Sequence, residues 1–465
     1  MSERKFEGRM SDTDALMWTV EKDPLLRSTI TAVALLDQSP DHDRVLEKID
    51  RGVRMIPRLR QRVVAPPLGV APPEWIYDHN FDLNYHLRFV RSAGDGSMRD
   101  LLDMAAPLAM QGFDRARPLW EYTVVEGLEG GRSAMILKVH HSMTDGVGGM
   151  KLLLMLFDFE REPEPLPPPD RVDAVPVFGP MDLVLSALGH NQRRVLGIAR
   201  RGVIESVGVT RAILDDPVHT LQEAWRVAGS VVRFLEPATD PYSPIMRART
   251  LARQLSTLDV PLDSLKQAGK TVGGSLNDSF VASVLGGLRQ YHELHGASVD
   301  ELRMVMPINL RSEGSALGGN HFTPARFLVP LTIKDPAERI VAVGRLTREI
   351  RAEPAVHLTD ALAGILNQLP TTITTALFGS MLKGADFVTS NVPGAPFEIF
   401  SAGARLERMY AFAPLAGAAL NVTLLSSCGT CCIGVNVDSV AVPDSDAFLR
   451  CLDEGFTEVL TLART

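Results

Sequence analysis

The chain has 465 residues, of which 45% are hydrophobic and 22% charged, with a formal net charge of −8 and a pI near 5.8. At about 150 residues per domain, this length predicts two or three domains with ample material for a core. The acidic balance argues against a general nucleic-acid binder, which needs a basic face to contact phosphates.

The first residues, MSERKFEG, are charged and lack the apolar core of a secretory signal. No stretch reaches the roughly 20 uninterrupted apolar residues that a membrane span needs. We therefore expect a cytoplasmic protein that is soluble or peripheral on a membrane.

In the first third of the chain, strand-like runs, which are β-branched or alternate polar and apolar residues, take turns with segments of helical periodicity. The predicted strands cover residues 28–36, 86–90, 120–126 and 133–141. The predicted helices cover residues 43–55 and 98–110, and a third opens after Asp145. Residues 1–160 are accordingly predicted to form one α/β domain.

A connector is predicted over residues 161–245. It begins with REPEPLPPPDRVDAVP, whose prolines exclude a helix or a central strand and favour a semi-rigid linker. Residues 178–234 then show helical periodicity and include the basic stretch HNQRRVLGIARR. Two interpretations of this stretch stay open: a solvated helix face, or a basic amphipathic helix that lies on anionic lipid.

A second α/β domain is predicted over residues 246–465. Its expected strands are 251–260, 303–310, 325–333 and 385–394, and its expected helices are 275–294 and 444–462. Neither G-x-G-x-x-G nor G-x-x-x-x-G-K-[ST] occurs in a suitable place, which argues against nicotinamide and ATP chemistry.

The four cysteines cluster late in the chain, three of them in SSCGTCCIG. This segment holds one C-x-x-C, whereas a zinc site needs a second pair of ligands at suitable spacing. Two β-rich runs flank it, so we predict a hairpin around a Gly-Thr turn in which the cysteines act as small apolar residues.

The segment KVHHSMTDGVGG, residues 138–149, carries the main chemical signal. Side chains alternate along a strand, so His140 and His141 point to opposite sides unless the strand has already ended. A neutral imidazole accepts a proton near pH 7, and a general base positioned beside a hydroxyl would activate it for attack on an acyl group. The alternative is a satisfied pair of core histidines followed by a helix N-cap. No H-E-x-x-H spacing accompanies the pair, which argues against a metal.

HHSMTDG resembles the HHxxxDG motif of acyltransferases with the chloramphenicol-acetyltransferase-like fold. The segments MSDTDALMW, RPLWEY, SLNDSFVAS, PINLR and TSNVPG occur in order along the chain. They are similar to landmarks of the bacterial wax ester synthase/diacylglycerol acyltransferase family. The resemblance implies an α/β (α+β) fold of two chloramphenicol-acetyltransferase-like domains. Each would be a mixed sheet with helices, and a linker would join them across a tunnel.

The resemblance also implies roles for single residues. His141 would be the general base, with His140 in a supporting role. Asp145 would orient the motif, with Arg311 as its candidate partner, and Gly146 is the motif glycine. Asn277 and Asp278 match an Asn-Asp pair associated with the substrate channel.

The implied function is transfer of a fatty acyl group from acyl-CoA to the hydroxyl of diacylglycerol, or of a long-chain fatty alcohol. Acyl-CoA would be a substrate, and neither a cofactor nor a metal is expected. The lipid substrates imply contact with the inner face of a membrane or with lipid droplets. Two alternatives stay open: a condensation-type or polyketide-associated acyltransferase with a carrier-protein donor, and an inactive lipid-binding relative. SSCGTCC stands where many members carry an aromatic residue and an asparagine, so the preferred acceptor is not determined.

Overall fold

A computed structural model describes most of the chain. The described residues are 8–66, 71–144, 146–164, 179, 181–190, 192, 227, 229–230, 236–238, 240–309, 322–354, 358–367 and 369–463.

The first of two large sheets has six strands in the order β11-β12-β1-β6-β5-β4. Its strands are β1 (Thr29–Leu36), β4 (Leu87–Arg91), β5 (Trp120–Glu126), β6 (Ser133–His140), β11 (Phe400–Ser401) and β12 (Ala404–Phe412). Only the β4–β5 pair is parallel within this described sheet, so the sheet is mixed. A separate ribbon joins β2 (Gln61–Val64) to β3 (Glu74–Tyr77).

The second sheet has the order β7-β14-β13-β10-β8-β9 and is also mixed, because β10 runs parallel to both β8 and β13. Its strands are β7 (Arg253–Pro261), β8 (Glu301–Asn309), β9 (Phe322–Pro330), β10 (Phe387–Pro393), β13 (Leu420–Ser427) and β14 (Thr430–Asp438).

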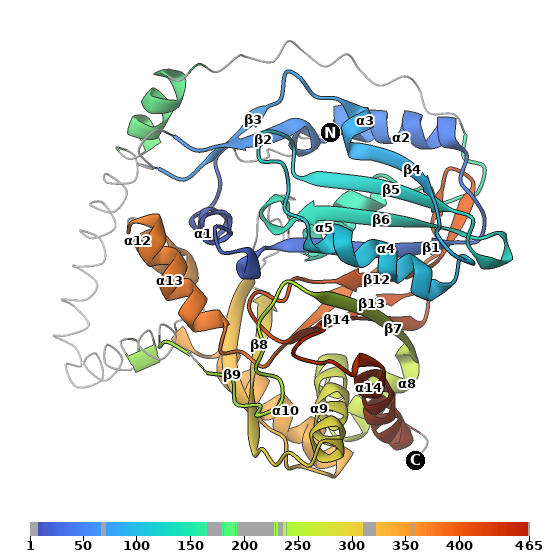
Figure 1. Cartoon of the computed structure of the whole chain (residues 1–465), viewed down its shortest axis with the longest axis vertical. Helices are drawn as coiled ribbons and strands as arrows, with labels where there is room; N and C mark the ends of the chain where they lie inside the picture. Colours follow the sequence, from blue (N-terminus) through green and yellow to red (C-terminus); the bar gives the residue numbers. More distant parts are fainter. Residues whose placement is uncertain are drawn as a thin grey trace.

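Helices cover both sheets, as Figure 1 shows. The helices of the first half are α1 (Asp12–Val20), α2 (His42–Met55), α3 (Leu83–His86), α4 (Met98–Met110) and α5 (Gly146–Leu154). Those of the second half are α8 (Leu262–Thr271), α9 (Leu276–Leu294), α10 (Pro336–Arg351), α12 (Thr359–Leu366), α13 (Thr371–Leu382) and α14 (Ser445–Leu460). Helices α8, α9, α10 and α14 gather below the second sheet in this view and bury one continuous apolar core against it.

Local sequence explains where the main helices begin. Ser97 and Ser275 each accept a hydrogen bond from the main-chain N–H three residues on, and the carboxylate of the aspartate there accepts one from the serine N–H. These capping boxes satisfy N–H groups that the first turn of a helix leaves without intrahelical partners. Asp335 caps α10 in a similar way, with Pro336 in the first turn.

The two halves share a sheet, which the domain boundaries predicted from the sequence did not anticipate. Strand β12 pairs antiparallel with β1, from Thr31 opposite Phe412 to Leu36 opposite Leu406. Residues 400–412, assigned from the sequence to the domain 246–465, therefore lie in the sheet of the first half. The reason is physical: the apolar pattern of a segment indicates that it forms a strand, whereas its partner depends on long-range packing.

The crossing strand lies close against the second sheet. A Cβ built on Gly434 in β14 would fall 2.1 Å from the main-chain oxygen of Ala411 in β12. A glycine at this position therefore allows the two strands to pack at this distance. The apolar cluster beside it unites residues of both halves, among them Val33, Ile136 and Leu255.

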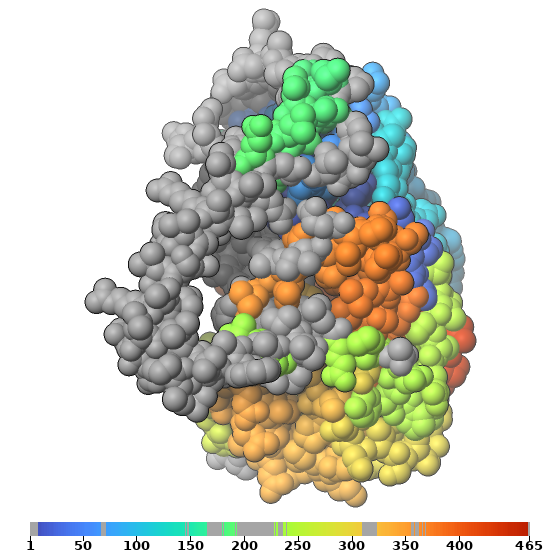
Figure 2. All heavy atoms as spheres, turned by 90° about the vertical axis from the view of Figure 1, so that its left-hand side faces the viewer, coloured from blue at the N-terminus to red at the C-terminus, as the bar shows by residue number. Residues whose placement is uncertain are grey.

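A second contact between the halves involves the first helix. Leu16 and Val20 of α1 pack against Ala363 and Leu366 of α12, and Asn367 Nδ2 donates to Asp12 O at 2.8 Å. Figure 2 shows α12 and α13 (orange) on the outer face between the upper and lower halves. The start of the chain thus packs on helices that come more than 300 residues later.

The predicted mixed α/β elements are confirmed, with strand and helix ends shifted by at most three residues. The turn of the cysteine hairpin was placed wrongly. Ser427 pairs with Thr430, so Cys428 and Gly429 form the turn, both with positive φ (45° and 79°). Six helices (α1, α3, α8, α10, α12 and α13) and four strands (β2, β3, β11 and β12) of the described structure were not predicted.

Of the predicted helical stretch 178–234, residues 181–190 are helical, and most of the remainder lies outside the described residues, as does the proline-rich segment 165–176. Within the described part of the chain, no helix is long and apolar enough to cross a membrane.

Candidate active site

The two histidines of the motif lie on either side of a strand end. His140 is the last residue of β6 and pairs with Thr29 of β1, while His141 opens a short 3₁₀ turn, η5 (His141–Met143). The N–H of His141 donates to Ser28 O at 2.8 Å. His140 is 1% exposed, whereas His141 is only partly buried. Of the two residues, His141 is therefore the more exposed.

His140 is held in place at both ring nitrogens. Its Nδ1 accepts from the Ser142 N–H at 3.0 Å and lies 2.7 Å from Ser142 Oγ. Its Nε2 lies 2.9 Å from Glu21 Oε1. By strict hydrogen-bond geometry this Nε2 has no partner, so Glu21 meets it through a close polar contact. The ring of Trp18 stands edge-on to His140 with centroids 5.5 Å apart.

Glu21 is a buried carboxylate. Burial by itself would raise its pKa, but His140 and the Ser28 N–H outweigh burial through charge and hydrogen bonds, and the pKa is lowered from its ordinary 4.5. Glu21 was not predicted from the sequence, since a glutamate just after a helix carries no motif. Ser142 is 1% exposed, so a thioester cannot reach its hydroxyl for attack.

The helix after the motif contacts the second half of the molecule. A Cβ on Gly146, the first residue of α5, would lie 2.8 Å from Val392 Cγ2 in β10. The neighbouring Asn391 donates from Nδ2 to Asn277 Oδ1 at 3.5 Å, and Asn277 Nδ2 lies 3.6 Å from Met306 Sδ. The structure thereby places Gly146 and Asn277 on either side of the TSNVPG strand.

Asp278 has a different environment from Asn277. Its Oδ2 accepts from the N–H and the hydroxyl of Ser275, both at 2.8 Å, and the residue is 6% exposed. In the described structure, this side chain completes the cap of α9. Asp145 and Arg311 lie outside the described residues, so the pairing expected between them stays a prediction.

The Pro-Leu-Trp element supports the motif strand by packing. Leu119 is fully buried and its C=O accepts from the His140 N–H at 3.0 Å. Trp120 Nε1 donates to Leu59 O at 2.8 Å, and His86 stacks on the Trp120 ring at 4.5 Å. These contacts hold the end of the motif strand against its neighbours.

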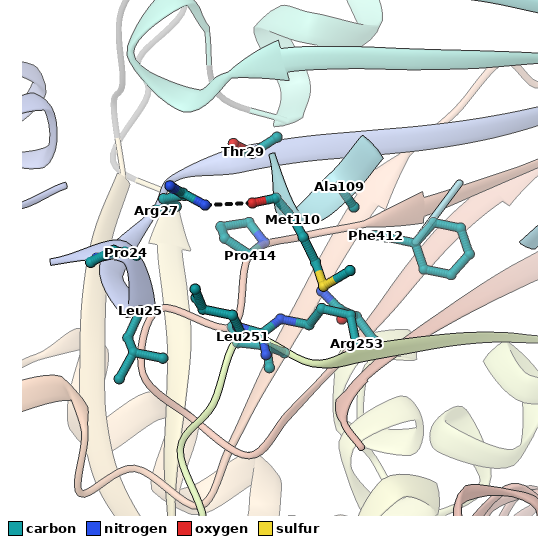
Figure 3. A pocket seen from close by; sticks show the side chains of 12 residues that line it. Pro24, Leu25, Arg27, Thr29, Ala109, Met110, Leu251, Arg253, Phe412 and Pro414 are labelled. Carbon is teal, nitrogen blue, oxygen red and sulfur yellow. Dashed lines mark hydrogen bonds between the residues drawn. The ribbon is translucent and has the colours of Figure 1, made fainter. Parts of the chain in front are cut away.

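A small cleft of about 30 Å³ lies between the two sheets (Figure 3). The start of β1, the end of α4 and the beginning of β7 line it, with the loop after β12. Arg27 Nη1 donates to Met110 O across the cleft at 2.6 Å. Thr29 in its wall is the strand partner of His140, so the cleft lies beside the motif.

The described residues contain no group of three or more side chains arranged to hold a metal ion. Burial raises the pKa of the Cys431 thiol to about 12 and that of Cys432 to about 11. Thiols with such pKa values are protonated at neutral pH and are poor nucleophiles or ligands.

Comparison with known proteins agrees with this architecture. The sequence matches the wax ester synthase/diacylglycerol acyltransferase catalytic domain over residues 10–280 and the WS/DGAT C-terminal domain over residues 318–459. A Mycobacterium tuberculosis protein named "Putative diacyglycerol O-acyltransferase" is 38% identical over 471 residues, which cover 100% of this chain and 94% of the relative. A second protein of that name and organism is 28% identical over 98% of each chain.

Two solved structures show a similar fold. The wax ester synthase/diacylglycerol acyltransferase from Marinobacter aquaeolei VT8 is 20% identical, with a TM-score of 0.62, over 98% of this chain and 100% of that one. The first condensation domain of the CDA synthetase is 14% identical with a TM-score of 0.62, over 99% and 97% of the two chains.

The two sheet-and-helix halves have the chloramphenicol-acetyltransferase-like fold, and the family match over residues 10–280 makes the chain an acyltransferase of this class. The chain belongs to the wax ester synthase/diacylglycerol acyltransferase family, as the family matches and the 38% identical relative show.

The close contact between Gly146 and Val392 leads to a prediction about packing between α5 and β10. Gly146→Ala should lower the free energy of unfolding by about 1–3 kcal/mol, because the new methyl overpacks against Val392. Adding Val392→Ala should restore part of that loss. Urea denaturation of the two single variants and the double variant measures the coupling, and strictly additive effects would contradict the contact.

The lowered pKa of Glu21 leads to a prediction about how the stability of the fold depends on pH. The unfolded chain takes up this proton more readily, so the stabilisation is fully present above about pH 4.5 and is lost as the pH falls through the folded-state pKa. Glu21→Gln should therefore cost most stability at neutral pH and progressively less in acid. Urea denaturation between about pH 3 and 7 measures this. The same change at the exposed Glu47 should show no such trend.

Proposed function

We propose that the protein transfers a fatty acyl group from acyl-CoA to the hydroxyl of diacylglycerol, giving triacylglycerol and CoA, with His141 as general base. Long-chain fatty alcohols are proposed as further acceptors, giving wax esters. The observation that carries the proposal is the contrast between the two histidines. His140 is buried, with Nδ1 bonded to the Ser142 N–H and Nε2 close to Glu21, whereas His141 is only partly buried and follows directly on the end of strand β6.

In the proposed reaction, the imidazole of His141 takes the proton of the acceptor hydroxyl as its oxygen bonds to the thioester carbonyl carbon. The tetrahedral intermediate then expels CoA thiolate, and the imidazolium returns the proton to that sulfur. No acyl-enzyme is required, in keeping with the buried hydroxyl of Ser142 and the protonated Cys431 and Cys432. Asn277, which is partly exposed beside β10, is our candidate for a donor to the developing oxyanion.

The proposal for acyl-CoA and diacylglycerol rests on family membership and on the names of relatives. A starter condensation domain of rhizomide synthetase, 10% identical with a TM-score of 0.57, was solved in complex with C8-CoA. That likeness shows the fold alone. A carrier-protein donor is the competing proposal, and an inactive lipid-binding relative is the non-enzymatic one.

Replacing the proposed base tests the mechanism. With palmitoyl-CoA and diacylglycerol, or hexadecanol, the wild type should release CoA only when acceptor is present. His141→Ala should lower this rate at least about 100-fold, the smaller effect expected for losing a general base. The assay follows free thiol.

His140→Ala is the comparison: it should lower the rate less than His141→Ala does, because it removes no proton acceptor from the reaction and acts only through the stability and placement of the turn. Equal rates for wild type and His141→Ala would remove His141 from the mechanism. Turnover only with an acyl carrier protein would favour the competing donor, and binding of acyl-CoA without turnover would favour the inactive relative.

We further propose that the protein is cytoplasmic and meets its lipid substrates at the inner face of a membrane or on droplets. Helix 181–190 (green in Figure 2) supports this, since Met181, Leu185 and Leu188 are exposed on it. Replacing these three residues by serine should reduce flotation with anionic phospholipid vesicles, while hexadecanol turnover in detergent stays near that of the wild type. Undiminished flotation would exclude this helix as the contact.

A further inference from the structure

The segment between α1 and β1 lies against the histidine motif, where Glu21 is close to His140 and Ser28 bonds His141. Glu21 ends the last turn of α1, and Ser28 immediately precedes β1. Both side chains are largely removed from solvent, and the side chain of Glu21 is 9% exposed. This short connection therefore brings a carboxylate into the interior beside the strand end that carries His140 and His141.

One oxygen of Glu21 serves two groups. Oε1 accepts from the Ser28 N–H at 2.6 Å and lies 2.9 Å from His140 Nε2. Beyond Ser28, its carbonyl oxygen accepts from the His141 N–H at 2.8 Å. Beyond His140, its Nδ1 accepts from the Ser142 N–H at 3.0 Å. The same carboxylate oxygen is therefore linked to the motif by two routes. One runs through Ser28 to His141, and the other runs through His140 to Ser142.

The other side of Glu21 is held as well. Arg115 Nη2 lies 3.6 Å from Oε2, and the Arg115 guanidinium stacks 4.0 Å above the Trp18 ring. Trp18 in turn packs edge-on against His140. The carboxylate therefore has a fixed position, and a fixed group in a poorly hydrated interior orients its neighbours strongly.

We propose that Glu21 is a positioning residue for the catalytic base: through His140 and Ser28 it sets the main chain of the His140–Ser142 turn, and thereby the place of the His141 ring. This inference rests on the proposed function of His141. A base displaced by about 1 Å can lose on the order of 100-fold in rate, so an intact turn matters for turnover as well as for stability.

The geometry points to an unusual pair of variants. Because one oxygen receives both contacts, the amide oxygen of Glu21→Gln can replace it, whereas Glu21→Ala removes it. We expect Glu21→Ala to lower kcat about 10- to 100-fold with the KM for palmitoyl-CoA within about threefold. Glu21→Gln should recover kcat to within about threefold of the wild type, despite losing the charge.

The matched control is a carboxylate network far from the motif. Glu458 of α14 bonds the guanidinium groups of Arg289 and Arg339 at 2.9 and 2.8 Å. Glu458→Ala should lower stability but leave kcat unchanged when both variants are assayed well below their unfolding temperatures. An unchanged kcat in Glu21→Ala would overturn the inference. So would a loss that Glu21→Gln fails to recover, or one that Glu458→Ala reproduces.

A readout without substrate separates this inference from the proposed function. Amide hydrogen exchange should speed up at His141 and Ser142 in Glu21→Ala, stay near wild type there in Glu21→Gln, and be unaffected there by Glu458→Ala. Unaltered exchange in Glu21→Ala would overturn the inference even if the enzyme is active. A wild type that releases no CoA, with the expected exchange pattern, would instead refute the proposed function and leave the turn anchored as described.

Discussion

Strand β1 is the element on which the arrangement of the molecule depends. One of its edges pairs with β6, which ends at His140, and the other pairs with β12, which belongs by sequence to the second half. The main chain just before it accepts the hydrogen bond of His141. A single strand thus connects the motif to the second half of the chain, so the two halves are not independent bodies joined by a linker. Helix α5, which follows the motif, also lies against β10 of the second half.

The predictable part of this structure is local. Alternation and helical periodicity predicted β1, β6, α4 and α9. Each of these elements buries one face, and the apolar residues of that face recur in the sequence at the spacing of a strand or a helix. From the motif we predicted that His140 and His141 point to opposite sides only if the strand continues through both, and the sequence did not show where the strand ends. The strand ends at His140, since the next residue turns back to bond Ser28.

What the sequence could not indicate depends on distant residues. The pairing of β12 with β1 joins segments about 375 positions apart, and no local pattern encodes such a partner. Glu21 is similar: its identity is ordinary, and its importance comes from burial beside His140. Asp278 shows the converse case. The family resemblance associates it with the substrate channel, but in the structure its side chain caps α9, as the S-x-x-D spacing by itself would predict.

The crossing of β12 has a consequence for how the protein is made. Until residue 412 has left the ribosome, β1 lacks its second neighbour, and an open strand edge is a template for aggregation. Synthesis of the first half alone would therefore leave this edge bare, however well its own core packs. The protein is committed to maturing late, as one unit, and a gene cut between the halves would yield fragments that need each other, or a chaperone, to stay in solution.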